Sequence, residues 1–236
     1  MTAEKIILNE ERNVILSVYL TEKAGGGPLP AVIVLPGGGY QICADIEAEP
    51  PAFAYREAGF HAFVLRYTVG SCCRWPLPLD DYEQAMEVIK DNAAAWGVDV
   101  NRIAVAGFSA GGHLAACAAV SAKNAPAAAV LVYPAILPPS MDSCPPDIPY
   151  PNELVSEHTC PCFFAAARDD DTVDIRSTLV MEQALAEHGV PFESHIYSTG
   201  GHAFSIGEAS PWGHELTPRL KNWVGESIGW LKEILL

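Results

Sequence analysis

One short segment near the middle of the chain restricts the possible folds more than any other. A β-branched apolar run at residues 102–106 leads into Gly-Phe-Ser-Ala-Gly-Gly (107–112), and an alanine-rich stretch follows at 113–120. We therefore expect a buried strand, a sharp turn and a buried helix, with Gly-x-Ser-x-Gly at the bend. The glycines are needed because a Cβ atom on either side of the serine would collide with the neighbouring strand or helix. The pattern predicts a nucleophile elbow that holds the Ser109 hydroxyl clear of the sheet.

Apolar runs and helical patterns alternate along the rest of the chain. Strands are predicted at residues 6–8, 14–20, 31–35, 60–65, 102–106, 127–133, 162–167 and 192–197. Helices are predicted near residues 48–58, 80–96, 113–120 and 181–188, and from 218 onward. Strands that alternate with helices predict an α/β fold, with a doubly wound, mainly parallel sheet covered by helices on both faces. The first two strands are expected to form an antiparallel edge, and a length of 236 residues fits a single domain, 1–236.

Residues 134–161 differ in composition from the rest. They contain eight prolines and show little periodicity. A long stretch without regular elements inside a compact domain is often functional. We expect residues 134–161 to form a short lid over the site.

Composition and charge exclude several classes of function. The formal charge of −15 repels phosphate backbones, which argues against a nucleic-acid partner and favours a neutral or weakly charged small molecule. No apolar run approaches the roughly 18 residues of a membrane-spanning helix, and the N-terminus does not resemble a secretory signal. The seven cysteines form no Cys-x-x-Cys pair. We therefore expect a cytoplasmic protein with reduced thiols, no metal and no cofactor.

Two loops downstream of Ser109 carry the groups that a serine nucleophile requires. A serine hydroxyl needs a base, and the base needs a group that orients it. In a parallel sheet such groups gather in loops after the carboxyl ends of strands. Residues 168–174 read Arg-Asp-Asp-Asp-Thr-Val-Asp, and residues 198–204 read Ser-Thr-Gly-Gly-His-Ala-Phe. The acid is therefore expected among Asp169, Asp170 and Asp171, and the base is His202, with His214 as the reserve candidate.

With these motifs the chain resembles the α/β-hydrolase esterases, especially small bacterial acetyl esterases and acetylxylan-esterase-like proteins. The matching segments are Pro36-Gly37-Gly38-Gly39-Tyr40, residues 107–115, Asp170-Asp171-Thr172-Val173, and Gly200-Gly201-His202-Ala203-Phe204. The resemblance implies an α/β-hydrolase fold and hydrolysis of small acyl esters, often acetyl groups on sugars. Two positions depart from the family pattern: Pro36 stands where histidine is frequent, and Asp174 stands where proline usually follows Val173.

The resemblance also implies roles for particular residues. Register with Val173 selects Asp170 as the triad acid, beside Ser109 as nucleophile and His202 as base. The backbone N–H groups of Ala110, Gly38 and Gly39 are the expected oxyanion hole. Aromatic side chains that suit an acyl or sugar pocket are Tyr40 and Trp75, with Tyr133 and Trp212 as further candidates.

Two other classes of function fit the same residues. An amidase or peptidase-type hydrolase, such as a formamidase, would use the same triad. A catalytically silent fold that only binds small molecules is the second alternative.

Overall fold

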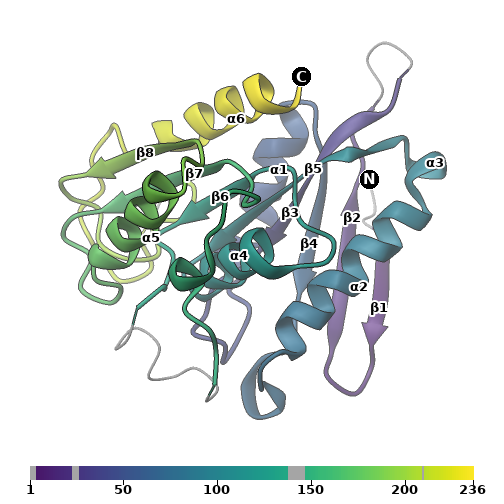
Figure 1. The fold of residues 1–236 in the computed structure, drawn as a ribbon, viewed down its shortest axis with the longest axis horizontal. Helices are drawn as coiled ribbons and strands as arrows, with labels where there is room; N and C mark the ends of the chain where they lie inside the picture. Colours follow the sequence, from purple (N-terminus) through teal and green to yellow (C-terminus); the bar gives the residue numbers. More distant parts are fainter. Residues whose placement is uncertain (1–3, 23–26, 138–146, 209) are drawn as a thin grey trace.

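The computed structural model describes residues 4–22, 27–137, 147–208 and 210–236. Its centre is an 8-stranded sheet in the order β1-β2-β4-β3-β5-β6-β7-β8 (Figure 1). The strands are β1 (Glu4–Asn9), β2 (Val14–Tyr19), β3 (Leu29–Leu35), β4 (His61–Arg66), β5 (Val98–Phe108), β6 (Ala129–Val132), β7 (Cys162–Ala167) and β8 (Phe192–Tyr197). The pairs β1–β2 and β2–β4 are antiparallel and all the others are parallel. The predicted mainly parallel sheet with an antiparallel edge is confirmed.

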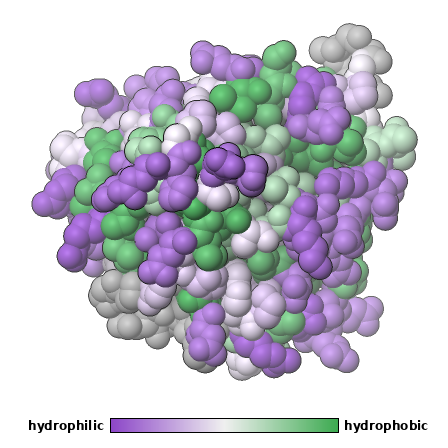
Figure 2. Space-filling model, in the orientation of Figure 1, coloured by the Kyte–Doolittle hydropathy of each residue, from purple (hydrophilic) through white to green (hydrophobic). Residues whose placement is uncertain are grey.

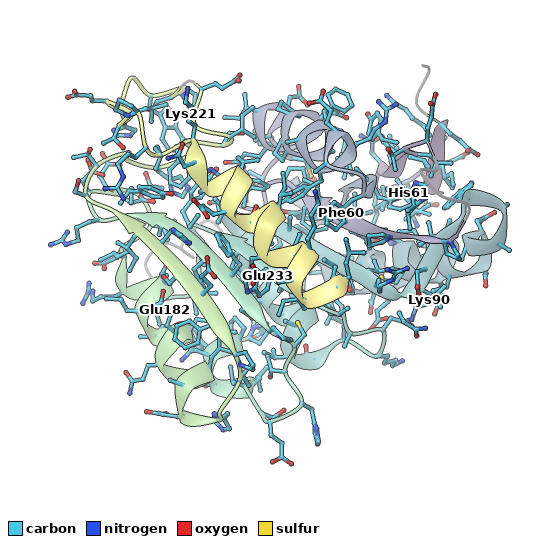
Figure 3. All side chains as sticks on the ribbon, turned by 90° about the horizontal axis from the view of Figure 1, so that it is seen from above. Phe60, His61, Lys90, Glu182, Lys221 and Glu233 are labelled. Atoms are coloured by element: carbon cyan, nitrogen blue, oxygen red, sulfur yellow. The ribbon has the colours of Figure 1, made fainter. Side chains whose placement is uncertain are left out.

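Helices cover both faces of the sheet. They are α1 (Glu49–Glu57), α2 (Leu77–Asp91), α3 (Ala93–Trp96), α4 (Ala110–Ser121), α5 (Arg176–Glu187) and α6 (Asn222–Leu235), with short 3₁₀ turns η1 (Asp45–Glu47), η2 (Gly70–Cys72) and η3 (Pro151–Leu154). Buried side chains of α2, α4 and α5 belong to one core cluster, and those of α1 and α6 belong to another. Seen from above, α6 lies obliquely across the sheet, with Lys221 at its N-terminal end (Figure 3).

The central strands supply both cores because their side chains alternate between the faces. On β3, Ile33 lies in the α2–α4–α5 core, whereas Val32 and Val34 lie in the α1–α6 core. All three side chains are fully buried. A parallel sheet covered on both faces requires such continuous apolar runs, which is why these strands are recognisable in the sequence.

The helix predicted at 80–96 differs from the structure at its start and in its interior. It begins earlier, at Leu77, because Pro78 falls in the first turn, where a missing N–H costs nothing. It is also divided at Asn92, whose side-chain amide donates to the Val88 carbonyl at 2.8 Å. Such a local bond competes with regular helical hydrogen bonding. The second part ends at Trp96, as predicted, and is followed by Gly97 with a φ of 71°.

The surface seen in Figure 2 is hydrophilic over much of its area, with smaller apolar patches between the polar side chains. No helix in the described part of the chain has the length and apolar character needed to cross a bilayer.

Candidate active site

The backbone around Ser109 forms a strand, a tight turn and a helix. Ser109 joins β5 to α4 with a φ of 52° and a ψ of −115°, a conformation that is strained for a residue with a side chain. A Cβ atom on Gly107 would meet the Gly111 carbonyl oxygen and the Ala115 side chain. A Cβ atom on Gly111 would meet the carbonyl oxygens that end β3. Glycine at both positions therefore lets the turn close against α4 and β3.

Ser109, His202 and Asp170 form a continuous chain of hydrogen bonds. His202 Nε2 lies 2.9 Å from Ser109 Oγ, and His202 Nδ1 lies 2.6 Å from Asp170 Oδ2. The other carboxylate oxygen, Asp170 Oδ1, accepts the backbone amides of Thr172 and Val173 at 2.9 and 2.8 Å. An ionised Asp170 can only accept, so Nδ1 carries the proton and Nε2 is left to accept the Ser109 hydroxyl. Ser109 and His202 are only 8% and 3% exposed, so the pair is largely shielded from water.

The neighbouring aspartates take other positions. Asp169 Oδ1 accepts the Gly201 amide at 2.9 Å, which ties the acid loop to the loop that carries His202. Asp171 is exposed, with its Oδ1 3.9 Å from His214 Nε2. Of the three aspartates predicted as candidates, Asp170 is the one hydrogen-bonded to His202. His214, the reserve base, contacts Asp171 and Trp212.

Two aromatic rings enclose the His202 imidazole. Trp212 is stacked on it, with ring centroids 5.4 Å apart and an angle of 10° between the planes. Tyr133 approaches it edge-on at 4.8 Å. These contacts restrict rotation of the imidazole, in addition to its two hydrogen bonds.

The predicted oxyanion-hole residues lie around Ser109. Gly38 and Gly39 line the same cavity as Ser109, with φ values of 124° and 61°. Ala110 is the first residue of α4, where backbone N–H groups have no partner within the helix. Among the described residues, no acceptor is hydrogen-bonded to the amide of Gly38 or of Ala110. These two N–H groups are therefore available to an oxygen atom of a bound molecule.

A cavity of about 620 Å³ opens over Ser109 and His202. Its apolar lining consists of Ile42, Ala44, Ile46, Val173, Ala203, Pro211 and Trp212. Its charged lining consists of Asp45 and Glu47, and no Lys or Arg among the described residues contributes to it. A neutral molecule with an apolar portion fits this lining better than an anion does.

The prediction that Tyr40 and Trp75 line the pocket is not supported by the geometry. Tyr40 is fully buried, with its hydroxyl 2.8 Å from His113 Nδ1 and its ring packed on Tyr67. Trp75 packs edge-on against the same His113 ring. The turn that follows Gly38 directs Tyr40 into the core, and adjacency to the glycine loop could not reveal this direction. Of the two further aromatic candidates, Trp212 lines the cavity, whereas Tyr133 is buried behind His202 and is not part of the lining.

The described part of the proline-rich segment does not reach the cavity. The Ala135 amide donates to the Ser109 carbonyl at 3.1 Å, and the Pro149 carbonyl lies 2.9 Å from His113 Nε2. None of the described residues 134–137 and 147–161 belongs to the cavity lining. Residues 138–146 lie outside the described residues, so the lid stays a prediction.

Glu47 is a buried functional candidate that the sequence analysis missed. It is 2% exposed, with Oε2 accepting the Gly37 amide at 2.8 Å and Oε1 accepting the Tyr133 hydroxyl at 2.7 Å. Burial raises the pKa of this carboxyl, while the Tyr133 bond, the nearby His202 and the Gly37 amide oppose the rise. Since acidic residues also stand at positions 45 and 49, the sequence offers no signal that singles out this one.

The family comparisons cover most of the chain. The model of the dienelactone hydrolase family matches residues 78–226, and the model BD-FAE matches residues 16–131. An acetylxylan esterase of Xylanibacter ruminicola is 27% identical over 250 residues, which cover 94% of this chain and 51% of that protein. The chain spans about half or less of the length of the curated relatives that it matches most strongly.

Two solved structures are similar over nearly their whole length. An α/β-hydrolase enzyme from a Medee basin deep-sea metagenome library superposes with a TM-score of 0.91 at 36% identity, covering 100% of this chain and 98% of that one. An acetyl ester-xyloside bifunctional hydrolase from Caldicellulosiruptor lactoaceticus superposes with a TM-score of 0.85 at 27% identity, covering 99% and 96%.

Proposed function

Because the chain belongs to the dienelactone hydrolase family of the α/β-hydrolases, we propose that it hydrolyses carboxylic esters of small molecules through an acyl-enzyme on Ser109. The observation that carries the proposal is the hydrogen-bonded chain from Ser109 through His202 to Asp170, of which Ser109 and His202 line the cavity. This arrangement provides a nucleophile, a base and a group that orients the base.

The first half of the reaction transfers the acyl group to the enzyme. His202 Nε2 takes the hydroxyl proton while Ser109 Oγ forms a bond to the ester carbonyl carbon. The negative charge that develops on the carbonyl oxygen faces the amides of Ala110, Gly38 and Gly39. When the tetrahedral intermediate collapses, the bond to the alcohol oxygen breaks, and the His202 imidazolium protonates the departing alkoxide.

The second half releases the acid. A water molecule gives a proton to His202 Nε2 and attacks the acyl carbon, and the Ser109–acyl bond breaks as the proton returns to Ser109 Oγ. Asp170 stays ionised throughout and stabilises the imidazolium that forms in both halves. Each preorganised oxyanion donor typically contributes about 10²–10³-fold to such a rate.

An acetyl ester of a carbohydrate is the substrate class that the relatives favour. One relative is named an acetylxylan esterase and one structural neighbour an acetyl ester-xyloside hydrolase. The cavity lining is compatible with an uncharged sugar ester, because the described residues contribute to it no Lys or Arg that could bind an anionic one. A cytoplasmic location and a single-domain organisation stay predictions from the sequence.

Substrate panels test the proposal and its alternatives. Turnover of p-nitrophenyl acetate by the wild-type protein, and its loss in Ser109→Ala, is expected for a serine esterase. Hydrolysis of an anilide in preference to the matching ester would instead favour an amidase. Binding without turnover of either compound would favour a silent binding protein.

A further inference from the structure

We propose that Glu47 is a positioning residue for the oxyanion-binding loop, holding the glycines at residues 37–39 at a defined distance from Ser109. This inference rests on the proposed ester hydrolysis and assigns a role to a side chain whose two oxygens are bonded to Gly37 and Tyr133 and not to a reacting atom. The relevant contacts join three loops that are far apart in the sequence.

The first contact joins Glu47 to the glycine loop. Glu47 Oε2 accepts the Gly37 amide at 2.8 Å, inside the protein. Glu47 and Ser109 both crowd the Cβ side of Gly37, because a Cβ atom built there would lie 2.6 Å from Glu47 Oε2 and 2.9 Å from Ser109 Cβ. The carboxylate and the nucleophile's Cβ atom therefore lie beside the same glycine, and the bond from the Gly37 amide to the carboxylate fixes how closely the loop approaches Ser109.

The same short segment orients the oxyanion donor itself. The Ala44 amide donates to the Gly37 carbonyl at 2.9 Å. In a planar trans peptide the N–H points away from the C=O, so this bond also sets the direction of the Gly38 N–H. Residues 44–47 thus hold the Gly37 backbone at both its amide and its carbonyl.

A further set of contacts connects Glu47 to the loop that carries the base. Glu47 Oε1 accepts the Tyr133 hydroxyl at 2.7 Å, and the Tyr133 oxygen in turn accepts the Ser205 amide at 3.1 Å. The Ser205 hydroxyl donates to the Ile46 carbonyl, next to Glu47. Tyr133 also contacts the His202 ring edge-on at 4.8 Å. One carboxylate therefore joins the oxyanion loop to the loop of His202.

A carboxylate is suited to this task by its chemistry. It offers two acceptor oxygens in one plane, and both are used here by donors from different loops. A buried carboxylate without such partners would be strongly destabilising. The bonds that stabilise the Glu47 carboxylate are the same bonds that align the loops.

Kinetic comparison of three variants tests the role. Glu47→Gln keeps the size of the side chain but loses one acceptor, and Glu47→Ala removes both. Glu49→Gln is the matched control, because Glu49 lies two residues away, binds Arg66 and Tyr19, and does not line the cavity. Oxyanion donors act on the transition state, so kcat for p-nitrophenyl acetate should fall about 10-fold in Glu47→Gln and about 100-fold in Glu47→Ala, with KM changed less than about 3-fold.

The control should retain kcat within about 2-fold of wild type. A folded Glu47→Gln variant with wild-type kcat, or one in which only KM rises, would overturn the inference. If Glu47→Ala does not fold, the Gln variant alone decides.

Hydrogen exchange of the Gly37 amide separates this inference from the proposed function. Glu47→Gln should speed that exchange by about 10-fold over wild type and over Glu49→Gln, because a neutral amide oxygen is a weaker acceptor. Unchanged exchange would overturn the positioning role whether or not the protein is an esterase. Faster exchange in a protein that hydrolyses no ester would support the positioning of the loop and contradict the proposed function.

Discussion

Trp212 lies parallel to His202, with the two ring centroids 5.4 Å apart and only 10° between their planes. Trp212 is 57% exposed and lines the cavity, so it separates the imidazole from solvent on that side. A stacked indole also stabilises a cation on its face, which favours the imidazolium formed during the reaction. The pair connects a surface side chain directly to the proposed base.

Replacing Trp212 should therefore affect catalysis more than folding. We expect Trp212→Ala to lower kcat/KM for p-nitrophenyl acetate by about 10-fold, with thermal unfolding close to wild type, because the exposed ring contributes little to the core. Trp212→Phe should recover part of the loss, since a smaller aromatic face remains. Steady-state kinetics of the three proteins check this, and an alanine variant as active as wild type would contradict it.

Removal of the Ser109 hydroxyl is the sharpest test of the mechanism. Ser109→Ala should reduce ester turnover by more than about 10³-fold, because it removes the hydroxyl that is hydrogen-bonded to His202 Nε2. Alanine keeps the Cβ atom and leaves the glycine contacts of the turn unchanged, so circular dichroism should match wild type. Wild-type activity in this variant would contradict the proposed acyl-enzyme intermediate on Ser109.

Replacing each of the three consecutive aspartates by asparagine should change kcat to a different extent. Asp170→Asn should lower kcat by about 10³–10⁴-fold, because the amide would favour the wrong imidazole tautomer. Asp171→Asn should remain near wild type, since that carboxylate is exposed and 3.9 Å from His214. Asp169→Asn should be intermediate, because an amide oxygen can still accept the Gly201 N–H. Measuring kcat for each identifies the acid, and equal losses in all three would contradict the assignment.

The predictable parts of the fold are those whose backbone structure is determined by a few neighbouring residues. Strands such as β3 and β7 are buried on both faces, so continuous apolar runs mark them within one or two residues. The elbow was recognisable because several glycines are required within a few positions of one serine. Gly97 likewise ends its helix for a purely local reason, a positive φ.

The parts that were not predictable depend on where side chains point. Tyr40 is adjacent to the oxyanion loop in sequence, yet its ring enters the core, whereas Trp212 is distant in sequence and reaches the site. Glu47 acts through bonds to Gly37, ten residues earlier in the same β3–α1 connection, and to Tyr133 in a distant loop. Tertiary contacts of this kind leave no periodic signal, so only the structure shows them.

The buried imidazole of His113 predicts a pH dependence of stability. It is enclosed between Tyr40 and Pro149, and burial lowers its pKa to about 4 from an ordinary value of 6.5. Below the ordinary value the unfolded chain binds a proton that the folded protein refuses, so acid favours unfolding. The stability that the neutral ring contributes is complete above about pH 6.5 and is lost as the pH falls toward 4.

Comparison with a non-titrating variant isolates this contribution. Between about pH 7.5 and about pH 5, the free energy of unfolding of the wild type should fall by about 2 kcal/mol more than that of His113→Asn. Urea unfolding at both pH values measures the difference, and the buried carboxylates cancel because both proteins contain them. His195→Asn is the matched control, since that histidine is paired with Glu193 near the surface and should leave the pH dependence close to wild type. Parallel curves for wild type and His113→Asn would show that His113 takes up its proton at the same pH in the folded protein as in the unfolded chain, which would contradict the lowering of its pKa by burial.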